Sequence, residues 1–539
     1  MAIHERVPNV VLAALTAGLL YLVFSPFTAR GVNDWYCSPE GTGTSCSFKK
    51  PCSMKTLMTD GMRGARPGDR FWARGGTYRT NDTTNRFIWN GLSCTKGQPC
   101  IFRNYNNEHV VIDCNYDLST AGGNGQCWGT ANAVGKYVTF WGFDFRNSST
   151  QSRVSPNEAG NDPPTTMNEI FLSAKGAGLV NNFIRDQNNG LQMIDYCTDG
   201  GVRNTAQGQH TIYGNYFQYN GYWGVLRSYG HSMYLHNPKT NGETDRSHIK
   251  ANVGLRAWHI GVQAYTSGGE ISYLTFQDNV EAAAGHGSRP TVSWPAKGNR
   301  TNWYLGADGG AAAGCGHNKV LRGAVFDNNW DWGAGTMTIG ASKGSCDVTL
   351  TNNRLLHTGG VITFGPRGAN FPPTTITGNY FYGAPDGSGS PMPAFTQANY
   401  PNNTYAESIP SSGPDVFKYV ANAYEAGRGW VAVWNPDSSA TVNIDPEKMG
   451  CVPGEKVRIY NWQDNDPWDS TPIATQTGCA ALDVSTTIAP ASITQPGFTT
   501  DGAGTLFPKP PDLGPQFVVY FMYPDWAGAA TPTPTPRPR

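Results

Sequence analysis

The sequence predicts an all-β protein: a right-handed parallel β-helix (a β-solenoid) over residues 32–395, followed by a small antiparallel β-sandwich over residues 401–526. Three observations lead to this fold class. The composition is rich in turn-forming residues, an asparagine-centred pattern recurs seven times along the chain, and the pattern ends near residue 400. The outer segments, 1–31 and 527–539, differ in composition from both domains.

The composition is that of a turn-rich β protein. The 539 residues include 65 Gly and 37 Pro, whereas charged residues make up 15% and aromatic residues 12%. So many aromatic side chains must be buried, which argues against a charge-rich disordered chain. A helical bundle would need far more Ala, Glu, Lys and Leu. The net charge of zero argues against a nucleic-acid partner, because such proteins carry a basic surface.

The two ends of the chain indicate its compartment. Residues 10–24 form an apolar run that fits a signal-peptide core better than a full membrane span. The next residues make a poor cleavage site because Phe27 is large, so the segment is interpreted as a signal peptide or an uncleaved signal anchor. Residues 527–539 form a Thr/Pro-rich tail of the kind that serves as a stalk or linker. We expect a secreted or cell-surface protein that touches a membrane only through this N-terminal segment.

Twelve cysteines in a chain with an export signal predict disulfide bonds. No Cys-x-x-Cys motif occurs, which argues against a thiolate zinc site or a redox motif. Close spacing predicts four local pairs, which are Cys46–Cys52, Cys94–Cys100, Cys114–Cys127 and Cys451–Cys479. A fifth pair, Cys315–Cys346, is expected from the cysteines that are left. Cys37–Cys197 is then the pair that remains.

The repeat consists of a β-rich stretch, an Asn and another strand, at intervals of 24 to 50 residues. A coil of three short strands and three turns takes about two dozen residues, so the longer intervals are coils with inserted loops. Coils cannot bury their apolar side alone and must stack. We expect the recurring Asn to tolerate the left-handed conformation at one bend and to form a hydrogen-bonded ladder. Its members are Asn182, Asn215, Asn252, Asn279, Asn329, Asn353 and Asn379.

One strand of each coil precedes the turn that carries the large insertions. These strands are predicted at 191–195, 232–236, 259–265, 302–306, 336–340 and 361–364. The loops flanking them, including 196–209, 237–247 and 285–301, would form walls around this column of strands. Loops gathered on one face of a rigid scaffold are where function usually lies.

The C-terminal region reads as short strands separated by turns, with strands expected at 416–419, 430–434, 441–444, 456–462 and 517–523. The leading interpretation is a cap over the open end of the solenoid, which would otherwise expose a strand edge. Sugar binding is the second interpretation.

Two segments carry a family resemblance. The stretch from Ala65 to Arg79 contains Arg-Pro-Gly-Asp, a strand, and then Arg-Gly-Gly-Thr-Tyr, and residues 230–237 read Gly-His-Ser-Met-Tyr-Leu-His-Asn. Over residues 33–395 the chain resembles secreted right-handed parallel β-helix repeat proteins of the pectate-lyase-like superfamily. The resemblance implies the fold. It does not specify an activity, because that superfamily includes lyases, hydrolases, epimerases and non-enzymes.

Strand alternation indicates which side chains leave the solenoid. Met233 and Leu235 should point inward, which leaves Ser232, Tyr234 and His236 pointing outward. On the following coils, His259, Gln263 and Tyr265, and then Asn302 and Tyr304, should point outward. Four of the ten histidines, including His231 and His248, lie within this short stretch, and histidine suits proton transfer. The predicted catalytic residues are His259, His236, Tyr234 and His231.

A groove lined by such residues suits a polysaccharide. The predicted substrate-binding residues are Gln263, Tyr265, Tyr304, Arg256, Lys250 and Asn237, where the two cations would neutralise a substrate carboxylate. The expected chemistry requires no cofactor. Ca²⁺ is the metal that loop carboxylates would hold, and the candidates are Asp195, Asp199, Glu243 and Asp245.

The favoured function is therefore an extracellular enzyme that cleaves a glycan, of a uronate-containing kind, by β-elimination. A glycoside hydrolase on the same scaffold, and a non-catalytic glycan-binding surface protein, stay open as alternatives. Hydrolysis needs two carboxylates at a suitable separation, and the sequence does not place the loop acids.

Overall fold

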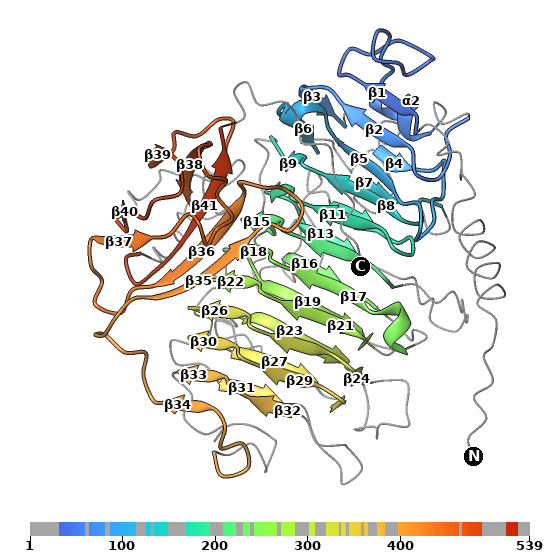
Figure 1. Ribbon diagram of the computed structural model, residues 1–539. Coiled ribbons are helices and arrows are strands. Elements are labelled where there is room, and N and C mark those ends of the chain that lie inside the picture. The colour runs from blue at the N-terminus through green and yellow to red at the C-terminus, as the bar shows by residue number, and fades with distance from the viewer. Residues whose placement is uncertain are drawn as a thin grey trace, which may run out of the picture.

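Figure 1 shows the computed structural model of the chain. It describes residues 32–59, 64–80, 87–114, 126–130, 134–148, 169–193, 208–222, 230–237, 242–266, 271–285, 301–307, 320–333, 336–340, 344–356, 361–364, 375–382, 397–462, 466–487 and 514–525. The expected signal segment and the Thr/Pro-rich tail lie outside these residues. Among the helices of the described part, none is long and apolar enough to cross a membrane.

The predicted fold class is confirmed: the chain forms a right-handed parallel β-helix followed by antiparallel sheets. Sheet 1 runs along the solenoid with eleven parallel strands. They are β1 (Asp34–Cys37), β2 (Arg70–Ala73), β5 (Cys100–Asn104), β8 (Val138–Trp141), β11 (Gly178–Val180), β14 (Thr211–Tyr213), β17 (Ser247–Lys250), β21 (Leu274–Gln277), β25 (Val325–Asp327), β29 (Thr349–Thr351) and β32 (Thr375–Thr377). A short helix, α2 (Met54–Met58), begins at the Ser53 cap between β1 and β2.

Sheet 2 has nine parallel strands and contains the strands that the sequence predicts beside the large loops. They are β4 (Phe87–Trp89), β7 (Gln126–Thr130), β10 (Glu169–Leu172), β13 (Leu191–Met193), β16 (His231–Leu235), β19 (Ile260–Thr266), β23 (Thr301–Ala307), β27 (Thr336–Gly340) and β31 (Val361–Phe364). A small sheet of β20 (Ile271–Ser272), β24 (Leu321–Arg322) and β28 (Ser345–Cys346) lies between sheets 2 and 1 along the chain.

Sheet 3 has eleven parallel strands and extends beyond the predicted C-terminal end of the solenoid. Its strands are β3 (Gly76–Arg79), β6 (Val110–Asp113), β9 (Asp144–Arg146), β12 (Phe183–Arg185), β15 (Tyr216–Gln218), β18 (Val253–Leu255), β22 (Val280–Ala282), β26 (Trp330–Trp332), β30 (Arg354–Leu356), β33 (Tyr380–Tyr382) and β34 (Thr404–Ala406). Because β34 pairs in parallel with β33, the solenoid continues past residue 395.

The asparagine ladder is confirmed and has one member more than expected. Each ladder side chain after the first accepts from the backbone N–H and the amide Nδ2 of the ladder Asn one coil earlier, at 2.8–3.0 Å. The ladder runs from Asn182 through Asn379 to Asn403. The left-handed conformation belongs to the preceding residue, as at Ala251 and Asp278, and not to the ladder Asn itself.

The C-terminal unit consists of antiparallel strands. The larger sheet contains β35 (Val416–Ala421), β36 (Gly429–Trp434), β41 (Phe517–Pro524), β38 (Lys456–Asn461) and β39 (Ala474–Thr477), and the smaller one pairs β37 (Thr441–Ile444) with β40 (Leu482–Ser485). The prediction that this unit caps the open end of the solenoid is wrong, because the unit packs against the side of the solenoid (Figure 1). Its apolar side chains, such as Trp430 and Phe521, share a core with outward-facing residues of sheet 3, such as Val253 and Trp330.

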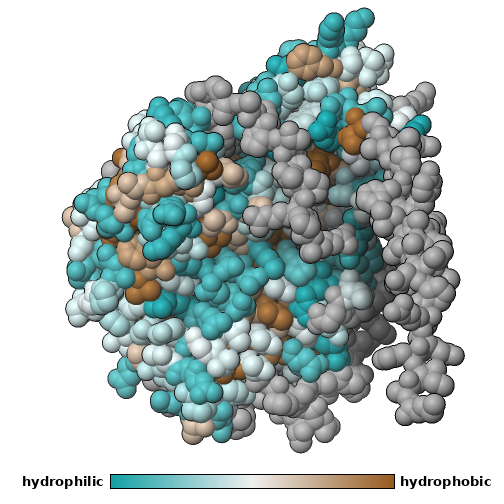
Figure 2. Space-filling view, in the orientation of Figure 1, coloured by the Kyte–Doolittle hydropathy of each residue, from teal (hydrophilic) through white to brown (hydrophobic). Residues whose placement is uncertain are grey.

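From β12 to β33 the outer face of sheet 3 is therefore buried beneath the C-terminal unit, whereas β3 at the start of the sheet is mostly exposed. Elsewhere, on the face in view in Figure 2, the described residues are mostly hydrophilic, with apolar residues scattered among them. Apolar burial takes place inside the coils and under the C-terminal sheet, where β36 and β41 are buried almost throughout.

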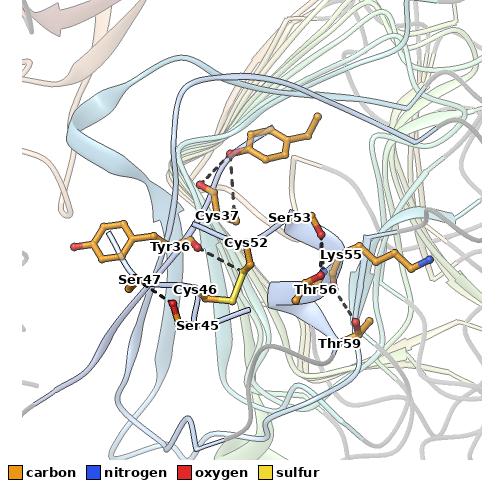
Figure 3. The surroundings of a disulfide bond; sticks show 11 residues. Tyr36, Cys37, Ser45, Cys46, Ser47, Cys52, Ser53, Lys55, Thr56 and Thr59 are labelled. Carbon is orange, nitrogen blue, oxygen red and sulfur yellow. Dashed lines mark hydrogen bonds between the residues drawn. A yellow bond between two sulfur atoms is a disulfide. The ribbon is translucent and has the colours of Figure 1, made fainter. Parts of the chain in front are cut away.

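The four local disulfides are confirmed: Cys46–Cys52, Cys94–Cys100, Cys114–Cys127 and Cys451–Cys479. Figure 3 shows the first of them, which closes a small loop beside α2. Cys346 is also disulfide-bonded, but its expected partner, Cys315, lies outside the described residues. The expected Cys37–Cys197 pair is wrong, because Cys37 is a free thiol buried in the core.

Candidate functional site

The outward face of sheet 2 carries one column of polar and aromatic side chains. Gln192, Tyr234, Gln263 and Tyr304 are consecutive register partners on β13, β16, β19 and β23. Their neighbours along each strand point into the core and are fully buried, among them Met233, Leu235, Val262 and Leu305. The column is half-buried. The alternation predicted from sequence for Tyr234, Gln263 and Tyr304 therefore holds.

The four predicted catalytic residues lie together at this column. The ring centroids of Tyr234 and His236 are 4.8 Å apart, and those of Tyr234 and His231 are 5.4 Å apart in a stacked arrangement. The ring centroids of His231 and His259 are 5.5 Å apart. Tyr265 lies 6.0 Å from Tyr304 on the next coil, again between ring centroids. We call the group of His231, Tyr234, His236 and His259 the His/Tyr cluster.

Burial governs the protonation of the His/Tyr cluster. It lowers the pKa of His236 to about 4, so this imidazole is neutral at pH 7. It also lowers the pKa of His231, with a smaller contribution from the nearby His259. Burial raises the pKa of Tyr234 to about 12, and Tyr265 and Glu169 add to the effect. The cluster thus places a neutral base, with Nε2 of His236 buried and unpartnered among the described residues, beside a protonated phenol.

Glu169, the first residue of β10, belongs to this site and was missed from the sequence. It is 7% exposed, and burial raises its pKa to about 7 although a hydrogen bond from Asn189 lowers it. Asn189 Nδ2 lies 3.0 Å from Glu169 Oε2. In the amide orientation that satisfies both groups, Gln192 Nε2 donates to the same carboxylate. Alternation within Glu-Ile-Phe-Leu, where Ile170 and Leu172 are buried, was the pattern that could have indicated an outward Glu169.

Arg256 and Lys250 do not reach the column. Arg256 follows β18 in a left-handed conformation and is 3% exposed, with its guanidinium 4.5 Å from the ring centroid of Trp462 in the C-terminal unit. Its Nη1 donates to the hydroxyl of Tyr219 at 2.5 Å. Lys250 ends β17 in sheet 1. The two cations expected to bind a substrate carboxylate therefore face other sides of the solenoid.

Three more residues expected to face outward are enclosed. Asn237 is fully buried and donates from Nδ2 to the carbonyl of Ser272 at 2.6 Å. Asn302 is fully buried, accepts from Ala284 N at 3.0 Å and donates to the Asp331 carboxylate. Ser232 is buried as well. Simple alternation fails at strand ends because side chains there close the turns. His248 lies on β17 of sheet 1, apart from the His/Tyr cluster.

Among the expected metal ligands, Asp245 is the one whose side chain the structure describes, and an ion pair with Lys175 engages it. Asp245 is buried, and its Oδ1 accepts from Lys175 Nζ at 2.7 Å and from Gln209 Nε2 at 3.0 Å. Asp195 and Asp199 lie outside the described residues, as does the side chain of Glu243. The loops expected to form the groove walls also lie largely outside them.

A different set, His109, Asp144 and Asp466, has the spacing of metal ligands. However, Arg185 Nη2 lies 2.9 Å from Asp144 Oδ2 and 2.5 Å from Asp466 Oδ2, and Arg146 donates to Asp144 as well. The two guanidinium groups supply the positive charge that a cation would bring. We therefore describe this set as an ion-pair network between sheet 3 and the C-terminal unit.

No protein-family model and no curated protein matches the chain. Among solved structures, pectate lyase Pel9A is 14% identical, with a TM-score of 0.37 over 67% of this chain and 79% of that chain. These are weak likenesses. PfbA, a surface adhesin of Streptococcus pneumoniae, is 10% identical, with a TM-score of 0.39 over 72% of this chain and 98% of that chain. The PL6 family alginate lyase AlyGC is 11% identical, with a TM-score of 0.29 over 72% and 54%. At these values they carry no argument about activity, which must come from the site itself.

Proposed function

We propose that the chain is an extracellular enzyme that cleaves an acidic polysaccharide by β-elimination on the outward face of sheet 2. The observation that carries this proposal is the pairing of His236 with Tyr234, next to the buried Glu169. One side chain is a neutral base and the other a protonated acid at neutral pH. Tyr234 lies on β16, and His236 follows directly after the end of this strand. The disulfide bonds agree with an oxidising, extracellular location.

The proposed step balances without any added reactant. The imidazole of His236 takes the proton from C5 of a uronate unit, and the electron pair of that C–H bond forms the C4=C5 double bond. The C4–O bond breaks toward the leaving oxygen, which receives the proton of the Tyr234 hydroxyl. The proton then passes from His236 back to Tyr234. Acid–base catalysis of this kind contributes about 10²- to 10⁴-fold to the rate.

Neutral donors at the column and beside it suit the substrate carboxylate. The Gln263 amide is the register partner of Tyr234. Glu169 lies on β10, two residues before the register partner of Gln192, and burial raises its pKa to about 7, so its carboxyl keeps a proton at higher pH than an ordinary glutamate does. Both can donate to a carboxylate whose charge must be reduced before C5–H is acidic. Tyr265 and Tyr304 offer aromatic rings to the sugar units on either side.

Glycoside hydrolysis is the second candidate, because a carboxylic acid with a raised pKa is what its general acid requires. Glu169 meets that requirement. Hydrolysis also needs a second carboxylate. Among the described residues, Glu169 is the one carboxylate whose charge acts on Tyr234.

The test is to incubate the full chain with a panel of acidic and neutral polysaccharides. For an acidic polymer we expect two signals that rise together. One is the ultraviolet absorbance of unsaturated uronate ends, and the other is the number of new reducing ends. New reducing ends without that absorbance would favour the hydrolase. Binding without any new ends would favour the non-catalytic glycan-binding protein.

A further inference from the structure

A cavity of about 210 Å³ lies where the C-terminal unit meets the first coils of the solenoid. Most of its lining comes from β38, β41 and the turn after β38, and Asn107 closes it from the solenoid side. The lining residues are Asn107, Arg458, Tyr460, Pro467, Trp468, Tyr523 and Pro524. Near this junction Tyr523 of β41 packs against Phe183 of β12, with ring centroids 6.0 Å apart. The cavity is on another side of the solenoid from the His/Tyr cluster, because sheet 3 and not sheet 2 faces the C-terminal unit.

The cavity walls are held in place by contacts across the junction. Trp468 Nε1 donates to the carbonyl of Asn107 at 3.1 Å, and its ring stacks on His109 with centroids 4.5 Å apart and planes within 1°. Asp466 Oδ1 accepts from the backbone N–H of Trp468 at 3.1 Å, and Asp466 Oδ2 accepts from Arg185. The aromatic wall is therefore fixed before any ligand enters.

The chemistry of the lining combines aromatic rings with one cation. Trp468, which is half-buried, offers a flat surface on which the C–H face of a sugar ring packs, whereas Tyr460 and Tyr523 are almost fully buried and support this wall from behind. Arg458 Nη2 donates to Asp525 Oδ1 at 2.6 Å, and a guanidinium has five N–H donors, so donors remain for an anion. Lys456 Nζ lies 2.8 Å from Asp525 Oδ2. Among the described residues, Arg458 is the one charged residue of the lining, and its remaining N–H donors lie at the cavity wall.

We propose that this cavity binds one pyranose unit that carries a carboxylate. The ring lies against the aromatic wall and the carboxylate accepts from Arg458. The volume is below the ~300–1,000 Å³ of sites for drug-sized ligands, so a single sugar unit fits better than an oligosaccharide. The inference stands on the cavity and does not depend on the proposed catalytic activity.

The experiment is isothermal titration calorimetry of the full chain with D-galacturonate, and with D-galactose as the neutral counterpart. We expect one galacturonate site per chain. Galactose should bind at least about tenfold more weakly, because it lacks the carboxylate that makes a charge-assisted hydrogen bond. Arg458→Gln should lose the preference for galacturonate. Lys456→Gln should retain it, because Lys456 shares Asp525 but does not line the cavity.

A second pair of variants separates this site from the groove. Arg458→Lys keeps the charge and should bind galacturonate more tightly than Arg458→Gln, and thermal melting identifies any variant that fails to fold. Gln263→Ala, on sheet 2, should leave the Arg458-dependent binding unchanged. The inference is overturned if the wild-type chain binds no galacturonate, if galactose binds equally well, or if Gln263→Ala rather than Arg458→Gln removes the binding.

Discussion

At the scale of single residues, Glu169 is the group whose ionisation most directly affects the candidate site. Burial raises its pKa from an ordinary 4.5 to about 7. A raised pKa means that the folded state binds the proton more tightly than the unfolded state. The stabilising contribution of Glu169 is therefore complete below pH 4.5 and is lost as the pH rises through 7. At ~1.4 kcal/mol per pKa unit, the loss is roughly 3 kcal/mol.

This predicts a pH-dependent difference between the wild-type chain and Glu169→Gln. Urea unfolding should show the wild type losing roughly 3 kcal/mol relative to the variant between pH 4.5 and pH 8. Glu447→Gln, at an exposed position, is the matched control and should show no such trend. A flat difference for Glu169→Gln would mean that the carboxylate is solvated in the native state.

The thiol of Cys37 supplies a second test at this scale. It is fully buried, and burial raises its pKa, although a contact with the Tyr78 hydroxyl lowers it in part. A buried protonated thiol is unreactive. We expect iodoacetamide to modify Cys37 only after denaturation, as read by mass spectrometry of its peptide. Rapid modification of Cys37 in the native chain would contradict its position in the core.

At the scale of elements, the asparagine ladder is what joins neighbouring coils at one bend. Asn252 is fully buried, and its Nδ2 donates to Asn279 Oδ1 at 3.0 Å and to the carbonyl of Ile212 at 2.9 Å. Asn252→Ala would leave the N–H groups of Asn215 unsatisfied as well. We expect a loss of about 1–3 kcal/mol in unfolding free energy.

Chemical denaturation followed by circular dichroism measures this loss. Asn402→Ala is the matched control, because Asn402 is exposed beside the last ladder position. The control should change stability by less than about 0.5 kcal/mol. Equal effects of the two substitutions would indicate that the ladder amides add nothing beyond ordinary loop contacts.

The same elements show how far sequence reasoning reaches. Repeated local chemistry is readable, so the Asn ladder and the strands of sheet 2 could be predicted, and alternation placed Tyr234, Gln263 and Tyr304 outward. Ladder member Asn403 was missed although it follows Asn379 by 24 residues, the spacing of a coil without an inserted loop, so the repeat interval was the signal that could have found it. Asn237 and Asn302 were misplaced because side chains at strand ends turn inward to satisfy turn and backbone groups.

The remaining errors depend on contacts between distant parts of the chain. Arg256 was expected in the groove, but it packs on Trp462 of the C-terminal unit. Glu169 was overlooked because its carboxylate acquires its raised pKa only when sheet 2 is assembled. The apolar residues on the outward face of β18 and β22 are explained by the C-terminal sheet that covers them, and local periodicity does not reveal which surface provides the cover.

At the scale of the whole molecule, the ion-pair network couples the C-terminal unit to the solenoid. Burial alone would raise the pKa of Asp144, but Arg185, His109 and Arg146 outweigh it and hold this pKa below the ordinary 3.8. A depressed pKa stabilises the fold at pH values above 3.8, and this contribution is lost as the pH falls below it.

Asp144→Asn is therefore expected to destabilise the chain at pH 7 by about 3–5 kcal/mol, because Arg146 and Arg185 lose their shared buried partner. The deficit should shrink as the pH falls below 3.8, where the wild type loses the same contribution. Calorimetry at several pH values measures both effects, with the exposed Asp483→Asn as control. A deficit that grows toward acid pH would contradict the depressed pKa.

The central claim is that the outward face of sheet 2 performs β-elimination through His236 and Tyr234. The most direct measurement is the rate of unsaturated-uronate release from an acidic polysaccharide by the wild-type chain, His236→Ala and His248→Ala. The last is the matched control, a histidine on sheet 1. We predict that His236→Ala loses about 10²- to 10⁴-fold in rate with an unchanged melting temperature, while His248→Ala keeps wild-type turnover. Near-full turnover by His236→Ala, or equal losses in both variants, would contradict the account.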